Sequence, residues 1–413
     1  MNSYLQESQP ERMKQPLLEV NHLKKHFTVG HGLFEQLSAR EKRYVHAVDD
    51  ISFSIYPGEI FCLVGESGCG KTTVARMLVG LEEPTFGFFK WNGKEISYND
   101  LKPKKGDVKT QIVFQNPFSA LSPRMRKGDA VLHPIAIHDE VSDSKTKENL
   151  RRSLLAEICL AFGTLLSFIF LMIAFLSTSG RIAGLSAIVG VSIFTIAFLV
   201  YLQYSRIKRS KIADTTVLNL FDEIGLAPPL QYYTKYPHEV SGGERQRSCI
   251  ARGIILNPTL LVADEPTSML DVSLRAGILD LLKSLQEAHD ISILFITHDL
   301  ATARHFGDRV GVMYVGKLVE KGDVDSIFKN PLHPYTKALI DAIPTPIPGE
   351  KTYNLPKGEV PDAIRPPSGC RFHPRCPVAA IKQSKICAEE EPILRELRAN
   401  HWVACHYPLV EEQ

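Results

Sequence analysis

Apolar residues in this chain gather into short runs that are each followed by polar or glycine-rich sequence. Residues 17–64 alternate apolar and polar positions, and the run Ile60–Val64 leads into a glycine-rich loop and then the helix-forming stretch VARMLVGL. Two further runs, Leu260–Ala263 and the ISILFIT sequence from Ile291, end at two acids and at His298. Because buried strands separated by helical stretches are typical of a parallel sheet, we predict an α/β fold with its chemistry at the strand ends.

The most apolar part of the chain lies in its middle. Residues 158–176 and 182–204 contain no charged residue, and each is close to the roughly 20 residues that cross a bilayer as a helix. Basic residues flank the pair at 145–152 and 206–211. Since basic residues concentrate on the cytoplasmic side, we predict a transmembrane hairpin over 154–204 with both outer flanks in the cytoplasm. A pair of buried helices within a helical subdomain is the alternative.

Composition limits the number of domains, the compartment and the partners. The 413 residues exceed the roughly 250 to 300 of a single core. The balance of 48 basic and 46 acidic residues argues against nucleic acid as a partner, and the first twenty residues resemble no secretory signal. We therefore expect the eight cysteines to be metal ligands or buried thiols rather than disulfides. The expected buried thiols are Cys62, Cys69, Cys159 and Cys249.

A phosphate-binding loop follows the first buried run. Residues 65–72 read GESGCGKT, directly after a predicted strand and before a predicted helix. The glycines let the backbone N–H groups face phosphates, Lys71 neutralises the β and γ phosphates, and the Thr72 hydroxyl can ligate Mg²⁺. This predicts a site for a nucleotide such as ATP, formed by Gly65, Glu66, Ser67, Gly68, Cys69, Gly70, Lys71, Thr72 and Thr73.

The acids after the second run complete a nucleotide-hydrolysing pair. A buried strand would deliver Asp264 to the Mg²⁺ sphere and place Glu265 where it can polarise an attacking water. Two acids after an apolar run are more often a helix cap or a turn. Together with the phosphate loop, they instead predict nucleotide hydrolysis.

Four further motifs occur in a fixed order with these two. The sequence VSGGERQR at 240–247 resembles the signature of ABC transporter ATPases, and Gln115 in QIVFQNP resembles their Q-loop glutamine. The sequence SMLD at 268–271 resembles their D-loop, and THD at 297–299 resembles the switch histidine. The resemblance covers roughly residues 17–335. It implies a P-loop NTPase (RecA-like) core with an antiparallel β subdomain and a helical subdomain carrying the hydrophobic insertion.

The same resemblance assigns roles to individual residues. The Ser241 hydroxyl and the amides of Gly242 and Gly243 would contact the γ-phosphate of a nucleotide held by the opposite subunit, since such a helix start binds anions. His298 would hold the γ-phosphate and the water in line, and Gln115 would sense Mg²⁺. The implied sets are Glu265, His298 and Gln115 for catalysis, Thr72, Gln115 and Asp264 for Mg²⁺, and Asp271 as a further ATP-binding residue.

Adenine stacking needs an aromatic side chain near the start of the core. Phe27, at the end of the first predicted strand, is the first choice, and Tyr44 is the second. An ordinary core or edge aromatic is an equal alternative for Phe27.

The C-terminal sequence narrows the resemblance to one branch. GESGCGKTT, QNPFSALSPRM, YPHEVSGGERQR and NPLHPYTKAL are similar to the oligopeptide and dipeptide importer ATPases. Cys370, Cys376, Cys387 and Cys405 follow the spacing C-x5-C-x10-C-x17-C, like the branch's C-terminal domain. Four thiolates suit a [4Fe-4S] cluster, which the resemblance implies for some members, or Zn²⁺, and free thiols remain possible.

The resemblance also implies an organisation and a set of partners. The expected parts are 17–138 with the phosphate loop and Q-loop, 139–213 as the insertion, 214–335 with the signature, acids and switch histidine, and 336–413 as the cysteine-bearing domain. The implied partners are a second ABC ATPase subunit (identical or homologous), two transmembrane permeases, an extracytoplasmic solute-binding protein and the membrane, but no nucleic acid. The chain would act at the cytoplasmic face of the cell membrane. Peptide, nickel chelate and oligosaccharide all stay open as solutes.

Overall fold

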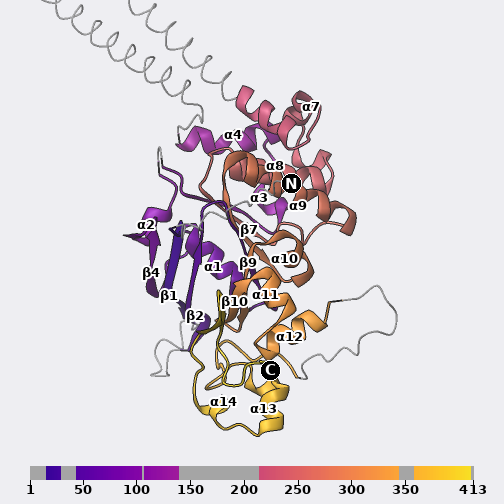
Figure 1. Ribbon diagram of the computed structural model, residues 1–413. Helices are drawn as coiled ribbons and strands as arrows, with labels where there is room; N and C mark the ends of the chain where they lie inside the picture. Colours follow the sequence, from indigo (N-terminus) through magenta and orange to yellow (C-terminus); the bar gives the residue numbers. More distant parts are fainter. Residues whose placement is uncertain (1–14, 29–42, 105–106, 139–213, 344–357, 411–413) are drawn as a thin grey trace, which may run out of the picture. The chain divides into compact units, whose positions relative to one another are not determined.

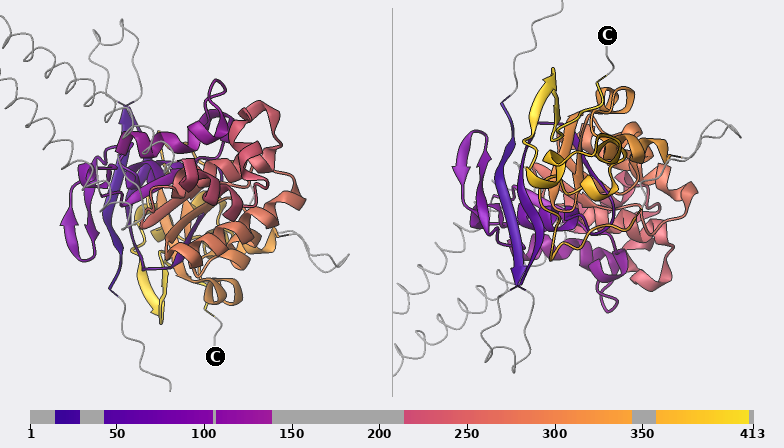
Figure 2. Two further views of the ribbon diagram at one scale, coloured as in Figure 1. Left: turned by 90° about the horizontal axis from the view of Figure 1, so that it is seen from above. Right: turned by 90° about the horizontal axis from the view of Figure 1, so that it is seen from below.

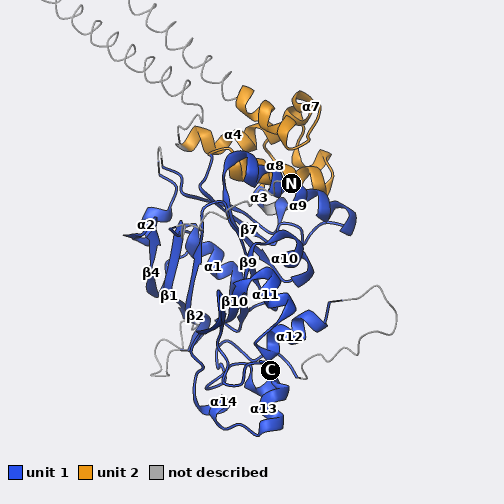
Figure 3. Ribbon diagram, in the orientation of Figure 1, with its two compact units in different colours: residues 1–120, 257–413 blue, residues 121–256 orange. Residues whose placement is uncertain are grey.

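The structure is a computed structural model, shown in Figure 1. It describes residues 15–28, 43–104, 107–138, 214–343 and 358–410. The chain divides into two compact units, residues 1–120 with 257–413 and residues 121–256 (Figure 3). The predicted hairpin at 154–204 lies outside the described residues. Within the described ranges, no helix combines the length and the apolar character needed to cross a membrane.

The larger unit is built on an eight-stranded sheet with the order β11-β12-β10-β9-β3-β8-β7-β6. Its centre is parallel: β3 pairs with both β8 and β9, and β7 lies between β8 and β6. Every residue of β3, β7 and β8 is buried, which explains why these strands read as continuous apolar runs. The predicted parallel α/β core is confirmed. The bounds are β3 (Ile60–Val64), β6 (Thr110–Val113), β7 (Leu260–Asp264), β8 (Ser292–Thr297) and β9 (Arg309–Tyr314).

Helices flank this sheet. Helix α1 packs against β7 and β8, whereas α10 packs against β3 and β8. Helix α9 buries Ile278, Leu281, Leu282 and Leu285, a helical spacing that places one apolar stripe toward the core. The bounds are α1 (Lys71–Leu78), α2 (Tyr98–Leu101), α3 (Pro117–Ala120), α9 (Val272–His289), α10 (Leu300–Phe306), α11 (Val324–Lys329) and α12 (Pro334–Asp341).

A second, antiparallel sheet has the order β2-β1-β4-β5. Its strands are β1 (Leu18–Thr28), β2 (Tyr44–Ile55), β4 (Phe86–Trp91) and β5 (Lys94–Ile96). The buried positions of β1 and β2 join α1 and the central strands in one hydrophobic core. The antiparallel β subdomain implied by the resemblance is therefore present.

The C-terminal region extends the central sheet. Strand β10 (Lys317–Asp323) pairs antiparallel with β12 (His401–Val403), which in turn pairs with β11 (Arg395–Arg398). The buried Glu320 of β10 reinforces this pairing, since its carboxylate lies 2.7 Å from His401 Nε2. The sequence suggests a small tail behind a linker, but its strands belong to the same sheet as the core (Figure 2). The remaining elements there are η2 (His373–Arg375), α13 (Pro377–Lys382) and α14 (Ile386–Glu389).

The smaller unit is helical in its described part. Helix α4 (Lys127–His138) packs against α7 (Pro229–Thr234) and α8 (Gly242–Ile254), and a short helix η1 (Pro237–Glu239) precedes α8. Lys127 is buried here, with Nζ 4.7 Å from the centroid of the Tyr232 ring. Burial lowers the pKa of Lys127 to about 8.

Candidate functional site

The phosphate loop joins β3 to α1 through backbone that only glycine fits. Gly65 and Gly70 have φ angles of 154° and 105°. A Cβ atom would lie 2.2 Å from the Met313 carbonyl oxygen at Gly65 and 2.1 Å from the Ala47 carbonyl oxygen at Gly70. Lys71 is buried and its Nζ donates to the Gly65 carbonyl oxygen at 2.8 Å. The glycines thus let the loop backbone curl, and the Lys71 ammonium lies across the curled loop.

A hydroxyl and a carboxylate lie together beside this loop. Thr72 Oγ1 donates to Asp264 Oδ1 at 3.2 Å, and Asp264 is 3 % exposed. Burial raises the pKa of Asp264, the Thr72 hydrogen bond opposes that rise, and the charge of Glu265 adds to it. A cation would offset the cost of keeping this carboxylate ionised, and oxygen ligands of this kind suit Mg²⁺.

Glu265 lies between two partners from the neighbouring strands. Its Oε2 accepts a hydrogen bond from Gln115 Nε2 at 2.9 Å and lies 3.2 Å from His298 Nδ1. Gln115, Glu265 and His298 follow β6, β7 and β8, so the ends of adjacent parallel strands bring them together. The backbone of Glu265 has φ 47°, a strained left-handed conformation of the kind that collects at functional sites. This carboxylate can take a proton from a water held beside it.

The predicted D-loop follows directly. Both the backbone N–H and the hydroxyl of Ser268 donate to the Glu265 carbonyl oxygen, at 3.1 and 3.0 Å. Asp271 is the N-cap residue of α9. The loop therefore braces the backbone of Glu265 and ends at Asp271.

The signature residues open α8 in the smaller unit. Ser241 is the N-cap, and its hydroxyl and backbone N–H both donate to Glu244 Oε2 at 2.8 Å. Glu244 completes a capping box, and its pKa is lowered to about 2, chiefly by the hydrogen bond from Tyr232. Gly242 and Gly243 form the first turn, whose N–H groups carry the positive end of the helix dipole. The phosphate contact predicted for Ser241 would require its hydroxyl to give up the bond to Glu244.

The two adenine-stacking choices lie at one end of a hairpin. Phe27 pairs with Val45 and Thr28 pairs with Tyr44. Lys25 Nζ lies 4.9 Å from the Phe27 ring centroid, whereas Tyr44 is 40 % exposed. The Tyr44 ring is thus the more exposed of the two. The sequence ranking of Phe27 over Tyr44 stays a prediction.

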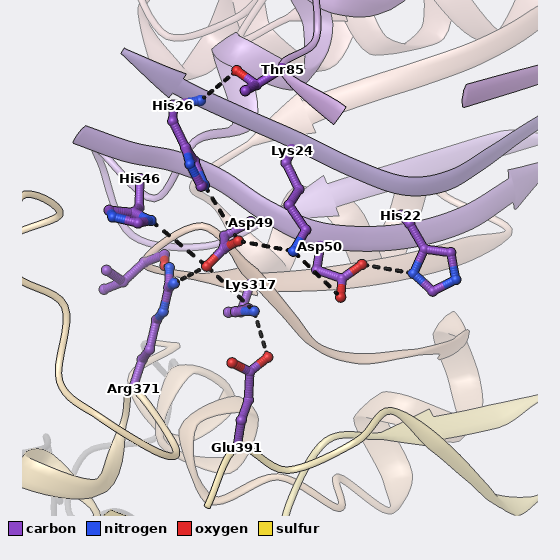
Figure 4. Close-up of polar contacts among 11 residues, drawn as sticks. His22, Lys24, His26, His46, Asp49, Asp50, Thr85, Lys317, Arg371 and Glu391 are labelled. Atoms are coloured by element: carbon purple, nitrogen blue, oxygen red, sulfur yellow. Dashed lines mark hydrogen bonds and ion pairs between the residues drawn. The ribbon is translucent and has the colours of Figure 1, made fainter. Parts of the chain in front are cut away.

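The hairpin register also assembles a group that the sequence did not suggest. His26 pairs with His46 across β1 and β2, and within the described part of the chain these histidines and Asp49 are the one set of three metal-type donors within 4.8 Å of one another. However, Asp49 forms ion pairs with Arg371, Lys317 and Lys24 (Figure 4). Burial alone would raise the pKa of Asp49, but these cations lower it overall. The surrounding positive charge opposes a metal ion, so this is an ion-pair network.

The four predicted cysteines do come together. Cys370, Cys376, Cys387 and Cys405 line one cavity with room for about one water molecule, about 10 Å³. Burial raises the pKa of Cys370 to about 11 and that of Cys405 to about 12. Without a metal, these thiols therefore keep their protons at neutral pH. Of the cysteines expected to be structural, Cys62, Cys69 and Cys249 are buried, and Cys159 lies outside the described residues.

A glycine-rich phosphate loop between a strand and a helix, with acids at the end of another strand of the same sheet, defines a P-loop ATPase. The chain belongs to the ABC transporter family, whose ATPase domain matches residues 48–268. Residues 319–382 match a second family, the oligopeptide/dipeptide transporter, C-terminal region.

Individual relatives agree over nearly the whole chain. The chain is 36% identical to "Putative oligopeptide transport ATP-binding protein YkfD" of Bacillus subtilis, covering 95% of each chain. It is 35% identical to "Oligopeptide transport ATP-binding protein OppF" of Escherichia coli, covering 94% of this chain and 95% of the relative. Among solved structures, it is similar to the dimeric ATP-binding cassette MJ0796 bound to ADP and Pi, with 19% identity and a TM-score of 0.49, covering 74% of this chain and 98% of that one.

Proposed function

We propose that this chain hydrolyses ATP to drive the uptake of peptides, or of a related solute, through a membrane permease. The observation that carries the proposal is the Glu265 carboxylate, held by Gln115 and His298 directly after the buried Asp264. The solute class is supported by the match of residues 319–382 to the oligopeptide/dipeptide transporter C-terminal region and by the relatives' names.

Each residue has a defined part in the proposed reaction. Lys71 and the loop amides bind the phosphates, and Thr72, Asp264 and Gln115 would hold Mg²⁺, which would neutralise phosphate charge. Glu265 accepts a proton from the attacking water, while Gln115 and His298 keep that water in line with the γ-phosphate. The left-handed backbone at Glu265, braced by Ser268, fixes where this carboxylate points.

The complete machine contains further subunits. Two ATPase subunits close around two ATP molecules, so that Ser241, Gly242 and Gly243 of one complete the phosphate site of the other. Two permease subunits and a solute-binding protein supply the pathway and the selectivity, and the ATPase acts at the cytoplasmic face of the membrane. Phe27, with Tyr44 as the alternative, stacks on adenine.

The uptake assay tests this proposal. Deleting the gene from its host should abolish the uptake of labelled di- and oligopeptides. The wild-type chain should restore uptake and Glu265→Gln should not. Labelled nickel and oligosaccharide form the comparison set. If uptake of all three solutes is unchanged by the deletion, the transport proposal is wrong.

The cysteine cavity is proposed to hold a [4Fe-4S] cluster, with Zn²⁺ as the alternative. A tetrahedral zinc ion with Zn–S distances of about 2.3 Å holds its sulfurs within about 4 Å of one another. Among the described residues, no three of the cysteine sulfurs come within 4.8 Å of one another. Either metal would therefore require the cysteine sulfurs to move, and the cavity must widen to admit a cluster.

Elemental analysis decides between the two metals. Anaerobically purified chain should contain iron and acid-labile sulfide with thiolate-to-iron absorption. Because the raised pKa values of Cys370 and Cys405 keep these thiols protonated, binding must release protons and metal retention should fall as the pH falls. Stoichiometric zinc would favour the alternative, and the absence of both metals would refute the site.

The apolar residues 154–204 are proposed to form a membrane hairpin that anchors the chain. The support is the length of the two uncharged runs within it, 158–176 and 182–204, and the basic residues on its outer flanks.

A further inference from the structure

The segment between Cys370 and Cys376 reaches the phosphate loop. Arg375 Nη1 and Nη2 donate to the two carboxylate oxygens of Glu66, at 2.9 and 3.2 Å. Nη1 also donates to the Tyr314 hydroxyl at 3.2 Å, and the Arg375 side chain is 9 % exposed. Because a two-pronged arginine–carboxylate pair fixes geometry as well as charge, it holds the second residue of the phosphate loop in one position.

Glu66 is held at all three of its polar groups. Its backbone N–H donates to the Tyr335 hydroxyl at 3.0 Å, and its carbonyl oxygen accepts from Lys71 Nζ at 3.0 Å. Its carboxylate is the partner of Arg375. The side chain of Glu66 therefore faces the C-terminal region, while its backbone forms part of the nucleotide site.

An aromatic cluster supports this contact. The ring of Phe372 lies 5.2 Å from that of Tyr314 and 5.3 Å from that of Tyr335, and these two tyrosines are the hydroxyl partners of Arg375 and Glu66. All three rings are buried. Phe372 thus packs the 370–376 segment against Tyr314 and Tyr335.

Arg371 forms a second arm from the same segment. It donates to the carboxylate of Asp49 (Figure 4) and to the carbonyl of Val315. The next residue, Gly316, donates its N–H to the Cys69 carbonyl oxygen at 2.9 Å. One arm therefore ends on Glu66, and the other leads through a single turn to Cys69, on the far side of the same loop.

Two of the four cysteines bracket these arms. The Cys370 N–H donates to the Cys387 carbonyl oxygen at 2.8 Å, and Cys376 is the N-cap of α13. Both cysteines line the shared cavity. The segment that carries Arg371 and Arg375 is therefore tied at both ends to residues of the cysteine cavity.

We propose that Arg375 is a positioning residue that holds the phosphate loop in its nucleotide-binding shape, and that it couples the state of the four cysteines to the affinity for ATP. A loop that is already shaped loses less conformational freedom on binding, so the pair strengthens nucleotide binding more than it changes the chemical step. The coupling to a metal rests on the proposed cysteine site, whereas the role of Arg375 does not.

Nucleotide titrations of the full-length chain test the role of Arg375. In the presence of Mg²⁺, Arg375→Met should raise the Kd for a fluorescent ATP analogue about tenfold, in the range of ordinary coupling between two sites. The KM for ATP should rise by a similar factor. The kcat should change less than about twofold, because the reacting groups remain. Arg375→Lys should recover part of the affinity, since an ammonium can still donate to one carboxylate oxygen. Lys329→Ala, which removes an exposed ion pair on α11, is the matched control and should bind as wild type.

A double-mutant cycle separates this contact from a general loss of stability. Glu66→Gln should weaken binding as Arg375→Met does, and the double variant should be no weaker than either single one. Glu66→Gln also keeps the C-terminal region intact if Arg375→Met unfolds it. Wild-type affinity in Glu66→Gln, or additive losses in the double variant, would overturn the proposal.

A separate variant tests the coupling between the four cysteines and ATP affinity. Cys376→Ser should raise the Kd for the nucleotide by a similar factor, but should add nothing in the Arg375→Met background. A Cys376→Ser chain with wild-type affinity would refute the coupling and leave the Arg375 role standing. A wild-type chain that binds and hydrolyses no ATP would instead refute the proposed function.

Discussion

At the residue scale, the Glu265 carboxylate is the proposed catalytic base. Glu265→Gln keeps the hydrogen bonds but loses the base, so ATP turnover should fall by about 100-fold or more while nucleotide binding persists. Phosphate release and nucleotide titration measure the two quantities. Glu287→Gln on the exposed side of α9 is the matched control and should keep wild-type turnover. Equal turnover in Glu265→Gln and wild type would contradict the role of the carboxylate as base.

Motifs made the residues at the strand ends predictable. Gln115, Glu265 and His298 follow apolar runs, and parallel strands carry such residues to one edge of a sheet. No local pattern links Glu66 to Arg375, because they are 309 residues apart and the contact depends on how the C-terminal region packs. The His26, His46 and Asp49 group depends on the register of β1 and β2, which alternation alone does not set.

At the scale of single elements, the start of α12 should respond to acid. His333 is buried and its Nδ1 accepts the Tyr335 N–H at 3.0 Å, which requires the neutral ring. Burial lowers the pKa of His333 from 6.5 to about 4, a difference worth about 3 kcal/mol of unfolding free energy. Between these values the unfolded chain binds a proton that the folded chain refuses, so stability is full above about pH 6.5 and is lost as the pH falls toward 4.

Denaturant unfolding from pH 7 to pH 4 checks this expectation. His333→Asn keeps an acceptor for the Tyr335 N–H but does not titrate, so it should lose less stability over that range than wild type does. Parallel pH curves for the two proteins would show that His333 does not contribute.

The apolar element at 154–204 gives a second prediction. If it is a bilayer hairpin, the chain expressed alone should stay with membranes after alkaline carbonate washing, since two apolar spans are not stripped like a peripheral subunit. Deleting 154–204 and inserting a short polar linker should release the chain while keeping ATP hydrolysis, because the phosphate loop, acids and signature lie outside the deletion. Full-length chain that is monodisperse without detergent would show that the reading is wrong.

At the scale of the whole molecule, the sequence predicted the parallel core because its apolar runs are local, whereas the antiparallel sheet was implied by the resemblance to ABC transporter ATPases. It did not predict that the C-terminal strands join the core. The stretch from 344 to 369 is rich in proline and glycine, which favours a linker, and β11 and β12 are short and partly polar. Pairing between β10 and β12 joins residues about 80 positions apart, and such long-range pairing leaves no periodic signal.

The pairing of β12 with β10 also covers an edge of the central sheet. Without residues 344–413, β10 would present a row of unsatisfied backbone N–H and C=O groups, a template for strands of other chains. When β11 and β12 are present, the outermost strand on this side of the sheet is β11. Its sequence RELR carries charges that discourage pairing with strands of other chains. A chain that ends at Ile343 and has 154–204 replaced by the short polar linker should therefore self-associate into sheet-rich aggregates, visible by light scattering and by thioflavin fluorescence. A dispersed, monomeric truncation would contradict this expectation. In addition to any part they take in transport, the C-terminal strands would therefore keep molecules of this chain from aggregating with one another.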